Sequence, residues 1–380
     1  MGRRLAVGWG TLPDRHLSPP PSAAPPLRVS NLPPSRHTPY DPRSVLLAPQ
    51  SLAKLTHRVA EVWRVDAPTF RTETVADLWS GYGGITRLRP PNDTPNDDPP
   101  PLIVKWVQPN ADPARQPRGW GGRASHDRKL RSYQIERTFY RNRSSLTGQF
   151  DGKIANHHGD DPDAWLLIED LDHAGYQRRV TDPNPTAIRT VITWLAKFHA
   201  ATIRPSTDPP PQDLWPIGTY WHLDTRIDEL HAMPADHPLR TAAASLDRTL
   251  RQCPYQCLLH GDAKMANFCF TPDRQQTASL DFQYVGGGVG VQDVVYFLTS
   301  VLGDDDCRRD AQRWFDEYFG VLDRQLTVSF AREVVPAWRR LIPVAWADFN
   351  RFLVGWCPTH AKLTPYAESM NRRALAKLTK

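Results

Sequence analysis

The sequence predicts an α+β fold of two lobes, with a strand-rich N-terminal lobe followed by a mainly helical C-terminal lobe. Runs typical of β-strands concentrate between residues 70 and 170, and helical spacing of apolar residues dominates after residue 185. The chain of 380 residues is long enough for two large cores, and its 40% hydrophobic content is typical of a folded protein.

Residues 1–45 differ in composition from the rest of the chain, because they are rich in Pro, Arg and Ser. Such a segment cannot bury enough apolar surface to offset chain entropy, which predicts a disordered arm. It lacks the continuous apolar core of a secretory signal, and its prolines oppose an amphipathic transit helix. A start codon placed too far upstream is an alternative. We therefore divide the chain into an arm at 1–45, an N-terminal nucleotide-binding lobe at 46–171 and a C-terminal lobe at 172–380.

Four strand-like runs and one helix make up the expected N-terminal lobe. The runs lie at Glu73–Trp79, Ile85–Arg89, Leu102–Val107 and Trp165–Glu169. A glycine-rich turn at Ser80–Gly84 separates the first two runs, and a helix is expected from Ser125 to about Leu146.

Helices dominate the expected C-terminal lobe. Residues Ala187–Ile203 carry apolar side chains at helical spacing, and helices resume from Asp293 to the end of the chain. Two short strands interrupt this pattern, at Cys257–Leu259 and Ala278–Phe282.

The excess of positive charge does not predict a nucleic-acid partner. The net charge is +6, but Lys and Arg alternate with acids along the whole chain, as on an ordinary solvated surface. The five cysteines lack disulfide or zinc spacing, which predicts reduced thiols packed in the core. No apolar run is long enough to cross a bilayer, and we expect a cytoplasmic protein of undetermined oligomeric state.

The most specific pattern lies in Leu259–Phe268. Here His260, Asp262 and Asn267 have the spacing His-x-Asp-x-x-x-x-Asn, and Asp281 follows at the end of a short apolar run. Phosphoryl transfer needs a carboxylate that orients the attacking hydroxyl and takes its proton, and oxygen ligands that hold magnesium. The pattern therefore predicts Asp262 as the catalytic carboxylate and Asn267 and Asp281 as ligands of Mg²⁺. His260 is expected to hydrogen-bond the loop rather than to move protons.

A lysine and a glutamate upstream complete the pattern. Lys105 lies in the middle of a predicted strand, where its charge would neutralise phosphate oxygens, and Glu136 lies on the next helix as its partner. The alternatives are a lysine that reaches water at a sheet edge and a glutamate that is simply solvated.

This order of residues resembles the aminoglycoside phosphotransferase and choline kinase superfamily, and within it the ecdysteroid-kinase-like branch and its bacterial relatives. The resemblance covers about residues 70–370 and rests on His260–Asp262, Asn267, Asp281–Gln283 and Asp293–Leu298. It implies a protein-kinase-like two-lobe fold, ATP and Mg²⁺ as cofactors, and a small-molecule hydroxyl as the phosphate acceptor. It also implies nucleotide contacts from the glycine turn, from the catalytic loop and from Ile168–Leu171, which resembles the hinge between the two lobes. These are Gly81, Gly83, Glu169, Leu171 and Lys264, beside Lys105 and Glu136.

The chain departs from protein kinases in two ways. Thr86 stands where a third loop glycine would fall, and Asp281–Gln283 lacks the glycine that follows the metal-binding aspartate in protein kinases. No Ala-Pro-Glu segment follows, which argues against a protein acceptor.

Other functions and roles stay open at this point. One alternative is a kinase-fold protein that binds nucleotide without transferring phosphate. An NAD-dependent oxidoreductase would fit the glycines at Gly286–Gly288, but Gly-x-Gly-x-x-Gly is not satisfied, and a mobile loop is expected there. Asp293 is expected to cap the helix that follows it, which is compatible with support of the catalytic loop. His199 is expected to pack between helices rather than to bind metal.

Overall fold

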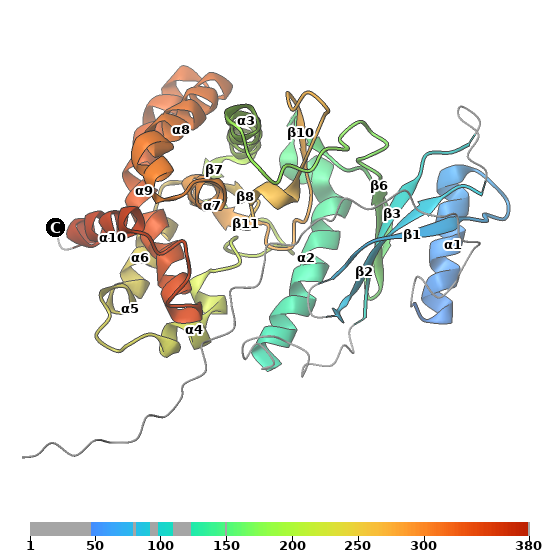
Figure 1. Cartoon of the computed structure of the whole chain (residues 1–380), viewed down its shortest axis with the longest axis horizontal. Helices are drawn as coiled ribbons and strands as arrows, with labels where there is room; N and C mark the ends of the chain where they lie inside the picture. The colour runs from blue at the N-terminus through green and yellow to red at the C-terminus, as the bar shows by residue number, and fades with distance from the viewer. Residues whose placement is uncertain (1–46, 79–80, 92–97, 109–122, 149, 379–380) are drawn as a thin grey trace, which may run out of the picture. The chain divides into compact units, whose positions relative to one another are not determined.

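The computed structural model describes residues 47–78, 81–91, 98–108, 123–148 and 150–378 (Figure 1). The predicted arm at 1–45 lies outside these ranges and stays a prediction, as do the lobe boundaries. Trp79, the last residue of the first predicted strand, and Ser80, the first residue of the predicted glycine-rich turn, also lie outside the described residues.

An antiparallel five-stranded sheet forms the centre of the N-terminal part, in the order β1-β2-β3-β6-β5. Its strands are β1 (Arg71–Asp77), β2 (Gly83–Arg89), β3 (Leu102–Val107), β6 (Trp165–Glu169) and β5 (His157–Asp161). Helix α1 (Pro49–Trp63) buries Leu55, Val59 and Trp63, which recur every four residues and so share one face. This face packs in one apolar cluster with Leu88 and Leu167 of the sheet.

Helix α2 (Arg123–Thr147) connects this sheet to the rest of the molecule. Tyr133 of α2 packs with Tyr82 and Val107, while Phe139 stacks on Phe282 from the C-terminal part at a centroid distance of 4.2 Å. The helix therefore contacts both the sheet and the segment around Phe282.

The C-terminal part is mainly helical. Its helices are α3 (Pro185–Thr202), α4 (Ile227–Ala232), α5 (Pro238–Thr241), α6 (Ala243–Arg251), α7 (Val291–Val301), α8 (Asp304–Gln325), α9 (Val328–Trp356) and α10 (Pro365–Leu378). The long helix α3 begins at Asn184, whose side chain accepts a hydrogen bond from the backbone N–H of Ala187. Its apolar face, with Val191 and Leu195, lies in the largest core cluster.

Two three-stranded sheets lie among these helices, in the orders β4-β10-β9 and β11-β8-β7. Their strands are β4 (Lys153–Ile154), β7 (Arg204–Pro205), β8 (Tyr255–Leu259), β9 (Phe268–Phe270), β10 (Thr277–Ser279) and β11 (Gly286–Gly288). Short turns of 3₁₀-helix also lie in the loops of this part of the chain, at η5 (Leu223–Thr225) and η6 (Met265–Asn267).

The prediction of a mobile loop at Gly286–Gly288 is wrong, because these glycines form the buried strand β11, which pairs with β8. A Cβ atom at Gly286 would lie 2.3 Å from the carbonyl oxygen of Trp215, so only glycine lets the two backbones approach this closely.

The predicted α+β class, with strands first and helices afterwards, is confirmed. Most element ends agree with the sequence within two residues. The exception is the run at Ala278–Phe282, which leaves the sheet after Ser279 because Asp281 has a φ of +67° that a strand does not accommodate. Within the described ranges, no helix is long and apolar enough to span a membrane.

Candidate active site

The loop that is predicted to be catalytic begins where β8 ends, at Leu259, and one buried carboxylate fixes its backbone. Asp293 accepts hydrogen bonds from the backbone N–H groups of His260 at 2.6 Å and Gly261 at 3.0 Å. Gly261 has a φ of +79°, and a Cβ atom there would lie 2.0 Å from the carbonyl oxygen of Tyr284, so this position requires glycine.

The sequence predicts that Asp293 caps helix α7, and this prediction is wrong. Asp293 is the third residue of the helix, and Gly290 occupies the cap position. Its carboxylate instead faces the loop and also lies 3.1 Å from Nε2 of His199. His199 is buried, with its other ring nitrogen 2.8 Å from the hydroxyl of Tyr318, as expected of a histidine packed between helices. Among the described residues, no group of three or more His, Cys, Asp or Glu side chains is arranged to hold a metal.

His260 stabilises the loop from within. Its Nδ1 accepts the backbone N–H of Asp262 at 3.3 Å, and its Nε2 lies 3.1 Å from the carbonyl oxygen of Leu280. This pattern fits a neutral imidazole that carries its proton on Nε2. Burial lowers the pKa of His260, although the carboxylate of Asp293 opposes this effect. The residue thus makes the structural contacts that the sequence predicts.

Three donors surround the carboxylate of Asp262, which is only 7% exposed. Its Oδ1 accepts a hydrogen bond from the hydroxyl of Tyr296 at 3.0 Å. Its Oδ2 accepts from Nζ of Lys264 at 2.9 Å and from Nδ2 of Asn267 at 3.1 Å. Asn267 also donates to the carbonyl oxygen of Asp262 at 2.8 Å, which closes the loop on itself. These contacts hold the carboxylate in one orientation, as a group that must receive a proton at a defined position requires.

Asp281 lies at the junction between the two parts of the molecule. Its Oδ1 is 3.0 Å from Nζ of Lys105 and accepts a further hydrogen bond from Nε2 of Gln283. Burial alone would raise the pKa of Asp281, but the ammonium groups of Lys105, Lys264 and Lys129 outweigh it and hold the pKa well below its usual range. Asp281 is therefore a carboxylate at neutral pH, as a metal ligand must be.

Lys105 and Glu136 form the pair that the sequence predicts. Lys105 lies on β3 and Glu136 on α2, and the Nζ–Oε2 distance is 2.6 Å with both side chains buried. Burial would lower the pKa of Lys105, but the carboxylates of Asp281 and Glu136 outweigh it and raise the pKa. Lys105 is therefore a fixed positive charge and is not at a solvated sheet edge.

The other predicted nucleotide contacts, at Gly81, Gly83, Glu169 and Leu171, differ in burial and in their neighbours. Gly81 has a φ of +75° with open space around its Cα, whereas Gly83 is required because a Cβ atom would lie 2.0 Å from the carbonyl oxygen of Trp106. Glu169 forms an ion pair with Lys153 at 2.6 Å, and Leu171 is buried in the main core. Their contacts with a nucleotide stay predictions.

The sequence interpretation missed two side chains near the site. Tyr296 lies one helical turn after Asp293 on α7, so that both reach the same loop. Lys129 lies two turns before Glu136 on α2 and donates to Oε1 of Gln283 at 2.9 Å. Its spacing of seven residues from Glu136 was the signal that could have revealed it. Burial lowers the pKa of Lys129 to about 8, although the carboxylate of Asp281 opposes this effect.

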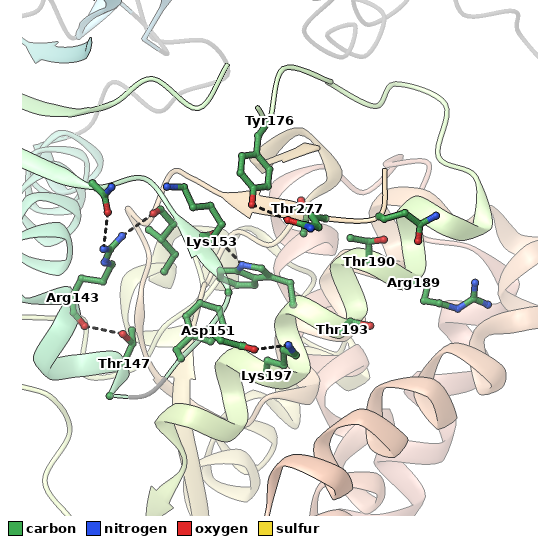
Figure 2. Close-up of a pocket in the computed structure, with 18 residues that line it drawn as sticks. Arg143, Thr147, Asp151, Lys153, Tyr176, Arg189, Thr190, Thr193, Lys197 and Thr277 are labelled. Atoms are coloured by element: carbon green, nitrogen blue, oxygen red, sulfur yellow. Dashed lines mark hydrogen bonds and ion pairs between the residues drawn. The ribbon is translucent and has the colours of Figure 1, made fainter. Parts of the chain in front are cut away.

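The structure also contains a cavity of about 640 Å³ (Figure 2). It is lined by residues from α2, α3 and the β4 and β10 segments, including Arg143, Lys153 and Lys197. Its charged side chains are largely paired, since Lys197 meets Asp151 at 2.8 Å and Lys153 meets Glu169. None of the predicted site residues lines it.

The sequence model of the phosphotransferase enzyme family (APH) matches residues 148–338, just over half of the chain. The chain therefore belongs to this family, and the matched region contains Asp262, Asn267, Asp281 and Asp293. The narrower ecdysteroid-kinase-like branch stays a prediction. A comparison with curated proteins finds no match.

Several solved structures are similar to the chain at low identity. The choline kinase LicA from Streptococcus pneumoniae is 12% identical, with 87% of this chain and 99% of that chain covered and a TM-score of 0.46. The amicoumacin kinase hAmiN, solved with AMP-PNP, Ca²⁺ and Ami, is 14% identical, with 86% and 92% covered and a TM-score of 0.45. The choice of acceptor must therefore be argued from the site of this chain itself.

Proposed function

We propose that the protein is a small-molecule kinase that transfers the γ-phosphate of ATP to a hydroxyl group, with Mg²⁺ as the metal. The observation that carries the proposal is the orientation of Asp262 by three hydrogen-bond donors. The loop that holds Asp262 contacts Leu280 through His260, and the neighbouring Asp281 pairs with Lys105, which also pairs with Glu136. Membership of the phosphotransferase family supports it.

In the proposed reaction, the carboxylate of Asp262 orients the acceptor hydroxyl and takes its proton. The hydroxyl oxygen bonds to the γ-phosphorus as the bond from this phosphorus to the β–γ bridging oxygen breaks, and ADP leaves with that oxygen. Tyr296 and Asn267 contribute by holding the carboxylate, because a general base must lie within hydrogen-bond reach of the proton it removes.

The side chains of Asp281 and Asn267 fit a magnesium ion, because they offer a carboxylate and an amide oxygen, the hard ligands that Mg²⁺ prefers. When bound, this ion would neutralise charge on the phosphate oxygens. Lys105 would contact the phosphates, and Glu136 keeps it in position at 2.6 Å. We propose Glu169 and Leu171 as contacts of the nucleotide base, and Gly81, Gly83 and Lys264 as contacts of the phosphates.

The test is a screen for acceptor-dependent ADP release, with hydroxylated metabolites, sterols, amino alcohols and aminoglycosides as acceptors. A kinase releases ADP with at least one of them, and mass spectrometry finds the phosphorylated product. If the protein binds magnesium-ATP but no acceptor stimulates ADP release, the alternative holds, namely a nucleotide-binding protein without transfer activity. If it binds no nucleotide at all, both assignments are wrong.

A further inference from the structure

A lysine far from the motifs lies beside the catalytic loop. Lys362 is in the connection between α9 and α10, and its Nζ lies 4.9 Å from the ring centroid of Tyr296 and 5.5 Å from that of Phe349. The hydroxyl of the same Tyr296 donates to Oδ1 of Asp262 at 3.0 Å. A single aromatic ring therefore separates the ammonium of Lys362 from the catalytic carboxylate.

The ammonium group of Lys362 has no acidic partner of its own. Within the described residues its Nζ makes no hydrogen bond and no ion pair, and its contacts are the two aromatic rings. Burial lowers the pKa of Lys362 to about 8, the carboxylate of Asp262 opposes this effect, and the charge of Lys264 adds to it. A half-buried cation without a counter-ion is costly to keep, so an anionic ligand would bind there favourably.

Asp262 is the acid whose charge acts on Lys362, and it already has a cation of its own. Asp262 itself is paired with Lys264 at 2.9 Å. The surroundings of Lys362 therefore hold a surplus of positive charge, which repels a cationic acceptor and attracts an anionic one.

The remaining surroundings are aromatic. Trp221, Tyr296, Phe349 and Phe352 form one buried cluster, and Tyr220 packs against it. Trp221, Phe349 and Phe352 are fully buried, so they fix the positions of Tyr296 and Lys362 rather than contact a ligand. Tyr220 is only partly buried, and its ring can contact the carbon skeleton of a small ligand.

On the basis of the proposed function, we propose that the acceptor carries an anionic group, a carboxylate or a phosphate ester, which binds to Lys362. In this arrangement the acceptor hydroxyl lies against Asp262, and the anionic group lies against Lys362. Lys362 is then the residue that selects acidic alcohols over neutral and amino alcohols. It takes no part in proton transfer, which remains with Asp262.

The inference is tested with matched acceptor probes that differ only in charge. The carboxylate arm compares glycerate, shikimate and pantothenate each with its primary amide, and the phosphate arm compares glycerol 3-phosphate with glycerol. Ethanolamine and kanamycin represent cationic acceptors. Binding is measured by calorimetry with a non-hydrolysable ATP analogue and Mg²⁺ present, and transfer is measured separately as ADP release.

Wild-type protein is expected to bind the acids of one arm at least about tenfold more tightly than their neutral partners, because a charged hydrogen bond is worth about one to two powers of ten in affinity. Lys362→Gln removes this ratio, Lys362→Arg retains most of it, and Lys362→Glu reverses it in favour of ethanolamine. Lys377→Gln, at an exposed lysine on α10, is the matched control and leaves the ratio unchanged. A thermal melt of each variant checks the fold, and the neutral Gln variant decides the matter if the Glu variant does not fold.

The inference is overturned if acids and their neutral partners bind equally, if cations bind best, or if the ratio persists in Lys362→Gln. The two proposals fail separately. Binding of acids that depends on Lys362, without ADP release from any acceptor, would contradict the kinase activity and leave the anion site standing. Transfer to neutral or cationic acceptors regardless of Lys362 would support the kinase activity and refute the anion site.

Discussion

Lys105 and Asp281 stand 176 positions apart in the sequence, yet the Nζ of one lies 3.0 Å from Oδ1 of the other. This ion pair joins strand β3 of the antiparallel sheet to the segment that contains Asp281, and Glu136 on helix α2 lies 2.6 Å from the same lysine. The same three side chains thus connect the two parts of the molecule and form the expected phosphate and metal site.

We predict that Lys105→Met lowers both stability and affinity for ATP. The substitution removes the ammonium group that pairs directly with the buried Glu136 and the partly buried Asp281. Breaking a buried pair in this way costs about 3 kcal/mol. Urea unfolding monitored by circular dichroism measures the free energy of unfolding. Lys377→Met, at an exposed lysine, is the control. A loss no larger than that of the control would show that the ion pairs at Lys105 do not contribute to stability.

We predict that Asp262→Asn abolishes turnover and leaves nucleotide binding nearly intact. Loss of a general base lowers kcat by about 10²–10⁴-fold, while the amide keeps the shape of the side chain. The measurements are kcat with an acceptor found in the screen and calorimetric binding of ATP. Asp273→Asn, in an exposed turn, is the matched control. Activity of the Asp262 variant within a few-fold of wild type would rule out the assignment.

We predict that Asp281→Asn weakens magnesium-dependent ATP binding more than Asn267→Ala does, because a carboxylate brings charge to the metal and an amide does not. Asparagine is the suitable replacement at position 281 because it tolerates the left-handed φ of +67°. Calorimetric titration of ATP with and without Mg²⁺ separates the metal-dependent part. Equal magnesium-ATP affinity in wild type and Asp281→Asn would refute the metal role.

We predict that Asp293→Ala destabilises the fold, although no contact of Asp293 with ATP, Mg²⁺ or the acceptor is proposed. The change leaves the N–H groups of His260 and Gly261 and the ring of His199 without their acceptor, and each buried donor left in this way costs about 1–3 kcal/mol. The expected loss of at least about 3 kcal/mol is measured by urea unfolding. Asp236→Ala, at an exposed acid, should change stability by less than about 0.5 kcal/mol. A comparable, small loss in both variants would mean that Asp293 does not hold the loop.

We predict that His260 makes the protein less stable in mild acid. Its pKa is lower in the folded than in the unfolded chain because of burial, so the unfolded state binds the extra proton more readily. Neutral His260 makes its full contribution to the free energy of unfolding above the unfolded pKa of about 6.5. This contribution is lost as the pH falls below that value, by at most about 1.4 kcal/mol per pH unit. Unfolding free energies between pH 7.5 and 5 should fall less steeply for His260→Gln than for wild type. Identical slopes would show that His260 does not titrate on unfolding.

Local sequence determined much of this protein. Helix α3 follows from the helical spacing of its apolar residues, and strand β3 follows from its run of apolar and β-branched residues. Both signals lie within the element that they predict. Asp262 and Asn267 meet because both lie in one short loop, so their spacing in the sequence sets their distance in space. The fold class and the identity of these candidate residues could therefore be predicted.

Tertiary packing decided the rest. The glycines at Gly286–Gly288 appear mobile in sequence, but the approach of Trp215 and the pairing with β8 make them a buried strand. Asp293 has the sequence context of a helix cap, but in the fold it is the third residue of α7, and its carboxylate accepts from the backbone N–H groups of His260 and Gly261. Lys362 carries no local signal at all, because its position beside Tyr296 arises only when the connection after α9 folds back on α7. Backbone preference and periodicity act over a few residues, whereas contacts between distant segments depend on how whole elements pack, and only the folded chain contains that information.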